Sequence, residues 1–214
     1  MALAMFEKTF WIVGGACTGK STLASAICES MGYKLIDMDA RIYGTWLSVY
    51  RADRYPENYR WIQQSNALEW ALQQSDEEYL RHCERVSQEY FRLLVIELDH
   101  VKNPQRHIVD GGFSSLTAWV GDIEHRNIIC LDVDRDLAVS EWNVHPKRVE
   151  FKHEILALPR GEKKWIRFLE LDALISSQLV KQANIYGVPV IHARQVESVE
   201  TLVGQVVELW ALNQ

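Results

Sequence analysis

The stretch WIVGGACTGKSTLASAI, residues 11–27, decides the fold. The pattern G-x-x-x-x-G-K-S runs through it from Gly14 to Ser21, after an apolar run and before an apolar helical pattern. In that setting the glycines let a loop curl with its backbone N–H groups directed inward, where they hold phosphate. We therefore expect a buried strand, a phosphate-binding loop and a helix that begins near Lys20.

The spacing within this loop assigns chemical roles. Lys20 is predicted to reach the β- and γ-phosphates of a nucleotide as a point charge, and the Ser21 hydroxyl to ligate Mg²⁺. The positive end of the following helix adds to the attraction for phosphate. An ordinary glycine-rich turn is the alternative interpretation. The predicted nucleotide-binding residues are Gly14, Gly15, Ala16, Cys17, Thr18, Gly19, Lys20, Ser21 and Thr22.

Composition limits the class of protein. A chain of 214 residues, 48% hydrophobic, can bury a substantial core, and we expect a single domain over residues 1–214. The formal net charge of -6 argues against nucleic-acid and anionic-membrane partners. Four cysteines without a C-x-x-C pair favour reduced thiols. The expectation is a cytoplasmic protein, monomeric or homodimeric, that does not span a membrane.

Strand-like runs alternate with helical stretches along the chain. Several runs are apolar on both faces, which is typical of parallel strands covered by helices on each side. The alternation predicts an α/β fold. The five runs are TFWIV (9–13), YKLIDMD (33–39), RHIVDGG (106–112), NIICLDVD (127–134) and VPVIHA (188–193).

Two capping signals mark helix starts within this pattern. Ser75 followed by Glu78 forms a capping box, which predicts a helix from residue 76 to about residue 101. Ser198 is the predicted N-cap of the final helix.

Three stretches resemble the P-loop kinases, which include nucleoside monophosphate kinases and shikimate and gluconate kinases. GKSTLASAICESMGYKLIDMD (19–39) resembles the opening of a shikimate kinase. IVDGGF (108–113) is similar to the third strand of adenylate kinases, and VIHARQVESVETLV (190–203) resembles their closing strand, adenine loop and last helix. The resemblance implies a three-layer P-loop fold with a five-stranded parallel sheet, ATP and Mg²⁺ as cofactors, and Arg194 among the nucleotide-binding residues.

Three aspartates follow predicted strands. Asp37 and Asp39, two apart on a strand, share one face at the end where ligands bind in open α/β sheets. A carboxylate there orients a substrate hydroxyl and takes its proton, or holds water around magnesium. The resemblance assigns Asp39 to the substrate and Asp37 to the outer shell of the metal. Asp110 is predicted to lie close to the magnesium; solvated turns are the alternative for all three.

A basic segment follows the fourth predicted strand. Residues 145–168 contain seven Lys or Arg and three Glu, a local charge of +4. The resemblance implies a mobile lid here that supplies arginines to the transferring phosphoryl group. Arg160, beside Pro159 and Gly161 in a predicted loop, and Arg167 are the candidates. A solvated helical face is the alternative interpretation.

The resemblance to P-loop kinases implies a helical acceptor-binding subregion at residues 41–105. Ten of the 22 aromatic residues of the chain fall between Tyr43 and Phe91. One interpretation is a pocket that stacks a flat or apolar acceptor and neutralises its anionic group. The other is that these aromatic side chains are simply core. The arginines interspersed among them are Arg41, Arg51, Arg54 and Arg60.

These patterns together predict a kinase that transfers the γ-phosphoryl group of ATP to a small-molecule acceptor, either a nucleoside monophosphate or a small hydroxylated metabolite. The N-K-x-D and L-S-G-G-Q signatures of GTPases and ABC ATPases are not found in the sequence. The alternative is a non-catalytic or regulatory ATP-binding module.

Overall fold

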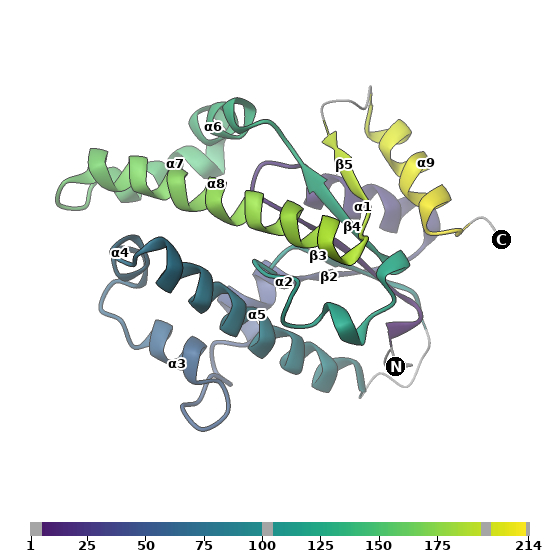
Figure 1. The fold of residues 1–214 in the computed structure, drawn as a ribbon, viewed down its shortest axis with the longest axis horizontal. Coiled ribbons are helices and arrows are strands. Elements are labelled where there is room, and N and C mark those ends of the chain that lie inside the picture. The colour runs from purple at the N-terminus through teal and green to yellow at the C-terminus, as the bar shows by residue number, and fades with distance from the viewer. Residues whose placement is uncertain (1–5, 100–104, 194–197, 213–214) are drawn as a thin grey trace.

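A five-stranded parallel sheet forms the centre of the protein (Figure 1). The computed structural model describes residues 6–99, 105–193 and 198–212. The strand order is β2-β3-β1-β4-β5. Because every neighbouring pair is parallel, all carboxyl ends lie at one edge of the sheet. Each of the five predicted strands is confirmed: β1 (Thr9–Gly14), β2 (Lys34–Asp37), β3 (His107–Asp110), β4 (Ile128–Asp132) and β5 (Val190–His192).

Helices cover both faces of this sheet, which confirms the predicted three-layer α/β arrangement. The alternation of β1 decides which side chains meet which helices: Phe10 and Ile12 pack toward one helix pair, and Trp11 and Val13 toward the other. The first pair is α1 (Lys20–Met31) and α9 (Val199–Leu209), and the second is α5 (Asp76–Asp99) and α8 (Gly161–Tyr186).

Two predicted caps are present. Glu78 accepts hydrogen bonds from the Ser75 N–H at 3.0 Å, while the Ser75 hydroxyl accepts from the Glu78 N–H at 3.3 Å, so the capping box opens α5. At α9, Ser198 Oγ accepts from Thr201 N at 3.2 Å. The residues just after Asp99, where α5 was predicted to end, lie outside the described part of the chain.

The end of β2 differs from the sequence expectation. The strand stops at Asp37, and a short helix α2 (Met38–Ala40) follows at once. Asp37 Oδ1 accepts a hydrogen bond from Ala40 N at 2.9 Å and caps this helix. Asp37 and Asp39 therefore do not share one face of a strand; the prediction on that point is wrong because the capping interaction ends the strand.

The subregion between β2 and β3 is helical, as predicted. After α2, the subregion contains a π-helical turn (Arg41–Thr45), α3 (Pro56–Ile62), α4 (Ala67–Leu72) and α5. A buried carboxylate ties two of these helices together: Glu89 of α5 accepts hydrogen bonds from the backbone N–H groups of Glu57 and Asn58 at 2.9 and 3.0 Å. Glu89 thus caps the N-terminus of α3 from a distant helix.

The basic segment forms helices that pack next to the phosphate loop. It comprises α7 (Pro146–Leu156) and the first turns of α8, and α6 (Arg135–Val144) precedes it. A separate apolar cluster joins these helices to α4, and Ala16 and Cys17 of the loop pack against that cluster. Its buried members are Leu72, Trp142, Ile155, Trp165 and Leu171.

Short 3-10 helices at Val120–Asp122 and His125–Asn127 complete the connection between β3 and β4. Within the described residues, no helix combines the length and apolar character needed to cross a membrane.

Candidate active site

The loop after β1 has the curled shape that its glycines predict. Gly14 has φ 140°, and a Cβ there would lie 2.2 Å from the Leu131 carbonyl oxygen. Cys17 and Gly19 also adopt positive φ angles, of 64° and 83°. The helix α1 begins at Lys20, with Ser21 and Thr22 exposed in its first turn. Backbone N–H groups at such a turn and helix N-terminus form an anion-binding concavity.

The Lys20 side chain folds back over this loop. Its ammonium group donates a hydrogen bond to the Gly15 carbonyl oxygen and lies 3.5 Å from Thr18 Oγ1. Burial lowers the pKa of Lys20, while the nearby carboxylates of Asp110 and Asp39 raise it. The cation therefore sits between the loop and two of the three predicted carboxylates.

Asp110 and Ser21 fit a magnesium ion. Asp110 ends β3 and is buried, and its Oδ1 has no hydrogen-bond partner among the described residues. Burial raises the pKa of Asp110, whereas a side-chain interaction with Ser21 and the charge of Lys20 lower it. An unpartnered buried carboxylate oxygen beside a hydroxyl supplies the hard ligands that Mg²⁺ prefers, with water and phosphate completing its shell.

Asp37 lies beside this pair, because it is the register partner of Asp110 across β2 and β3. Its charge raises the pKa of Asp110. No group of three or more His, Cys, Asp or Glu that could hold a metal occurs in the described part of the chain. Mg²⁺ that is bound with a nucleotide usually takes one or two protein ligands, and water and phosphate supply the rest.

A cavity of about 530 Å³ opens directly from the loop. Gly14, Gly15 and Ala16 form part of its wall, together with Asp39 and Asp172. Aromatic side chains from the helical subregion, the β3–β4 connection, α7 and α8 supply much of the remainder. They are Tyr43, Trp61, Trp70, Tyr79, Tyr90, Phe113, Phe151 and Phe168.

The aromatic residues of the subregion divide between the cavity wall and the core. Trp61 and Trp70 line the cavity. By contrast, Trp46, Tyr50 and Tyr55 are buried in the main core.

Asp39 stands where the loop and the cavity meet. It is accessible from the cavity, yet partial desolvation raises the pKa of its carboxyl group. The nearby charges of Lys20 and Arg148 lower that pKa. A carboxylate in this position can contact a molecule in the cavity and the phosphate end of the site at once.

Two residues that sequence reasoning missed complete the charges of the site. Arg148, in the first turn of α7, lies over the Trp142 ring at 4.6 Å from its centroid and interacts electrostatically with Lys20 and Asp39. Asp172 of α8 accepts a hydrogen bond from Trp142 Nε1 at 2.9 Å. Burial raises the pKa of Asp172, and Trp142, Lys20 and Arg148 lower it.

Only Asp172 leaves a signal in the sequence. It interrupts an apolar stripe on α8, formed by Phe168, Ile175 and Leu179 at helical spacing. A charge on such a stripe is unfavourable unless it has a partner or a function. Nothing in the local sequence singles out Arg148 from the other cations of the basic segment.

The two arginines predicted for the lid make contacts away from the phosphate loop or are exposed to solvent. Arg167 forms an ion pair with Asp76 at 2.7 Å and donates to the Gln74 carbonyl oxygen at 2.8 Å. Arg160 is exposed at the N-cap of α8, with φ 62°. Within the described part of the chain, neither forms a hydrogen bond or an ion pair with the loop. Their catalytic roles stay predictions, and Arg194 lies outside the described residues.

The arginines of the helical subregion do not line the cavity either. Arg41 pairs with Glu97 at 2.6 Å, Arg51 with Asp53 at 3.4 Å, and Arg60 with Glu57 at 3.4 Å. Arg54 lines a separate cavity, whose wall is formed mainly by α5 and the β3–β4 connection. The expectation that these arginines neutralise an anionic group in the aromatic pocket is therefore not met.

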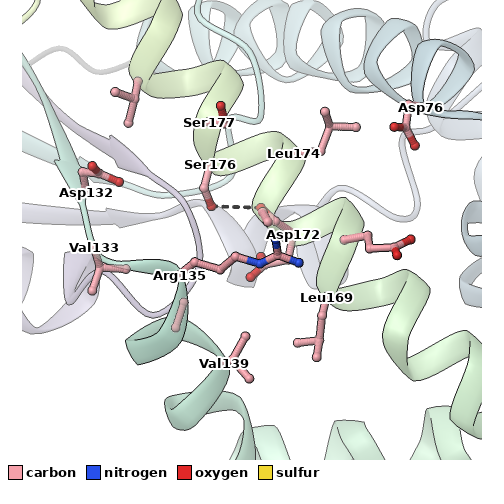
Figure 2. A pocket seen from close by; sticks show the side chains of 14 residues that line it. Asp76, Asp132, Val133, Arg135, Val139, Leu169, Asp172, Leu174, Ser176 and Ser177 are labelled. Carbon is pink, nitrogen blue, oxygen red and sulfur yellow. Dashed lines mark hydrogen bonds between the residues drawn. The ribbon is translucent and has the colours of Figure 1, made fainter.

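A second cavity, of about 550 Å³, lies between α6 and α8 (Figure 2). Figure 2 shows Arg135 at the start of α6 extending toward α8, where Ser176 Oγ donates to the Asp172 carbonyl oxygen at 2.9 Å. None of its described lining residues belongs to the phosphate loop. The cavity that includes the loop in its wall is therefore the candidate site.

No protein-family profile and no curated protein sequence matches the chain. Solved structures that align with it include a shikimate kinase from Bacteroides thetaiotaomicron (17% identity, TM-score 0.49, 94% of this chain and 97% of that one). Others are a shikimate kinase from Acinetobacter baumannii in complex with shikimate (14%, 0.48, 98% and 97%) and a Thermus thermophilus protein (21%, 0.42, 83% and 97%). The assignment of a three-layer P-loop fold rests on the strand order and loop geometry.

Proposed function

We propose that the protein is an ATP-dependent kinase that transfers the γ-phosphoryl group to a hydroxyl of a small molecule. The observation that carries the proposal is the continuity of the phosphate loop with the aromatic cavity, with Asp39 at their junction. A carboxylate that faces both the loop and the cavity is placed to contact an acceptor and the phosphates together.

On the donor side, the loop N–H groups and the start of α1 bind the β- and γ-phosphates. Lys20 exchanges its hydrogen bond to Gly15 for one to these oxygens, since its flexible side chain already lies over the loop. Because Lys20 stabilises negative charge that spreads over the transferring group, its contribution is greatest in the transition state.

Magnesium would be held by the Ser21 hydroxyl and, through water, by Asp110. When bound, it neutralises charge on the β- and γ-phosphates. Asp110 also opposes the effect of burial on Lys20, because its carboxylate raises the pKa of that ammonium group.

On the acceptor side, Asp39 accepts a hydrogen bond from the acceptor hydroxyl and takes its proton. The acceptor oxygen forms a bond to the γ-phosphorus as the bond from that phosphorus to the β–γ bridging oxygen breaks, which releases ADP. The raised pKa of Asp39 makes it a stronger base than an ordinary carboxylate.

Arg148 is the cation of the basic segment that serves the transferring phosphoryl group in this proposal. Its stacking on Trp142 holds the guanidinium in one orientation, near Lys20. A preorganised cation of this kind stabilises developing charge without reorganising during the reaction.

The test is ADP formation from Mg²⁺·ATP across a panel of nucleosides, nucleoside monophosphates, sugar acids, cyclitols, pyridoxine and thiamine. The proposal predicts ADP formation that rises strongly with at least one acceptor. Tight ATP binding without acceptor-dependent turnover across the panel would contradict it and favour the non-catalytic module.

A further inference from the structure

We infer that the acceptor is a flat alcohol without an anionic group, either neutral or positively charged. The inference rests on the proposed function and concerns the same cavity. It departs from the sequence expectation, which placed arginines there for an anionic acceptor.

The charges on the cavity wall carry the argument. Among the described residues that line it, the carboxylates Asp39 and Asp172 are present, and no Lys or Arg is. The remaining titratable group of note is His82, whose pKa is lowered by burial although Glu57 opposes the shift. Burial thus disfavours a positive charge on the imidazole, and the two carboxylates are the acidic groups that face the cavity.

The nearest cations have other partners. Lys20 and Arg148 lie at the phosphate end, where bound ATP would bring several negative charges. Arg60 lies over the Trp70 ring, at 5.0 Å from its centroid, and pairs with Glu57. An anionic acceptor would thus meet two carboxylates and the ATP phosphates without a cation of its own, which is electrostatically unfavourable.

The shape of the wall favours a flat molecule. Tyr43 is 63% exposed and meets Trp61 edge-on, with the ring centroids 5.8 Å apart. Trp70 is fixed edge-on against His82 at 4.9 Å. Aromatic surfaces of this kind stack on flat rings and attract cations, and a volume near 530 Å³ suits a molecule of one or two rings.

Matched pairs of probes test the inference by titration calorimetry with Mg²⁺ and a non-hydrolysable ATP analogue. Pyridoxine is compared with 4-pyridoxic acid, which replaces a hydroxymethyl by a carboxylate, and thymidine with thymidine monophosphate; thiamine is the cationic probe. We expect at least one neutral or cationic probe to bind, and each neutral probe that binds to bind about tenfold or more tightly than its anionic partner.

A charge reversal in the wall sharpens this test. Asp172→Lys should shift the preference of the pyridoxine pair toward 4-pyridoxic acid. Glu162→Lys, an exposed change on the same helix outside the cavity, is the control and should leave the preference unchanged. Tighter or equal binding of the anionic members by the unchanged protein, or no binding of any neutral or cationic probe, would overturn the inference.

The outcome separates the inference from the proposed function. Neutral or cationic probes that bind but are never phosphorylated would contradict the kinase and leave the charge preference intact. ADP formation that depends only on anionic acceptors would support the kinase and overturn the charge preference.

Discussion

The phosphate loop and the aromatic cavity meet in one site but are built in opposite ways. The loop consists of consecutive residues, 14–22, whose shape follows from local glycines and from the start of α1. The cavity gathers side chains from the helical subregion, the β3–β4 connection, α7 and α8. A local motif can therefore be read from sequence, while the chemistry of the acceptor depends on how distant helices pack.

The largest loss is expected on the loop side, from Lys20→Ala. Acceptor-dependent ADP formation should fall by about 10³-fold, because a preorganised cation is removed from the transition state. The thermal unfolding midpoint should change little, since the ammonium group contacts the loop and no apolar core. Lys181→Ala, at an exposed position of α8, is the matched control. Near-normal turnover in Lys20→Ala would contradict the kinase.

Asp39→Asn tests the junction of the two regions. Turnover should fall by about 10²-fold, within the range for loss of a general base, while ATP affinity is nearly kept. Asp110→Asn is the comparison, and there the loss should shrink as the magnesium concentration rises. If Asp39→Asn weakens ATP binding as much as turnover, Asp39 belongs to the metal site instead.

A smaller loss is expected for Arg148→Gln. Because this guanidinium is only half-buried, solvent screens it, and turnover should fall by about tenfold. Arg160→Asn keeps a side chain that tolerates the left-handed backbone and should have a smaller effect. Measured kcat values that rank these variants in the reverse order would restore Arg160 as the principal cation of the basic segment.

The pH dependence should report Asp39. A base acts only when deprotonated, so kcat/KM should fall as the pH drops through the pKa of this group. Burial raises that pKa above its ordinary value of 3.8, which places the acid limb of the profile above pH 3.8. The profile of Asp39→Asn should lack this limb; an unchanged acid limb in the variant would assign it to another group.

The smallest expected effect on turnover comes from Glu89→Ala, which alters how the helical subregion is held. Removal of this carboxylate leaves the Glu57 and Asn58 N–H groups without their partner, at a cost of about 1–3 kcal/mol in the free energy of unfolding. Urea denaturation measures that cost. The KM for the acceptor should rise more than the Kd for ATP. Equal changes would argue that the phosphate loop and the aromatic cavity do not depend on separate parts of the structure.

The sequence predicted the five strands, the loop and the first residue of α1, because each depends on neighbours along the chain. Asp39 and Asp110, the carboxylates predicted for the site, do lie near Lys20, although the capping of α2 by Asp37 changed the local structure around Asp39. Arg148 could not be chosen from sequence, because only the packing of α7 brings it near Lys20.

The prediction that arginines of the helical subregion neutralise an anionic group in the cavity was not met, for a related reason. Arg41 pairs with Glu97 because helix packing brings the two residues together. Arg60 pairs with Glu57, one turn earlier on the same helix. Composition counts the arginines of a segment but does not say which of them are already paired. The net charge of a cavity wall is therefore a property of the tertiary structure.

The central claim is that the loop and the cavity are the two halves of one catalytic site. Ala71→Trp tests it most directly, because Ala71 lines the cavity and a larger side chain would fill it. ATP affinity and acceptor-dependent ADP formation are measured together, with Ala52→Trp in an exposed part of the same subregion as the control. We predict unchanged ATP affinity and loss of acceptor-dependent turnover in Ala71→Trp alone. Full turnover with the cavity filled would contradict the account.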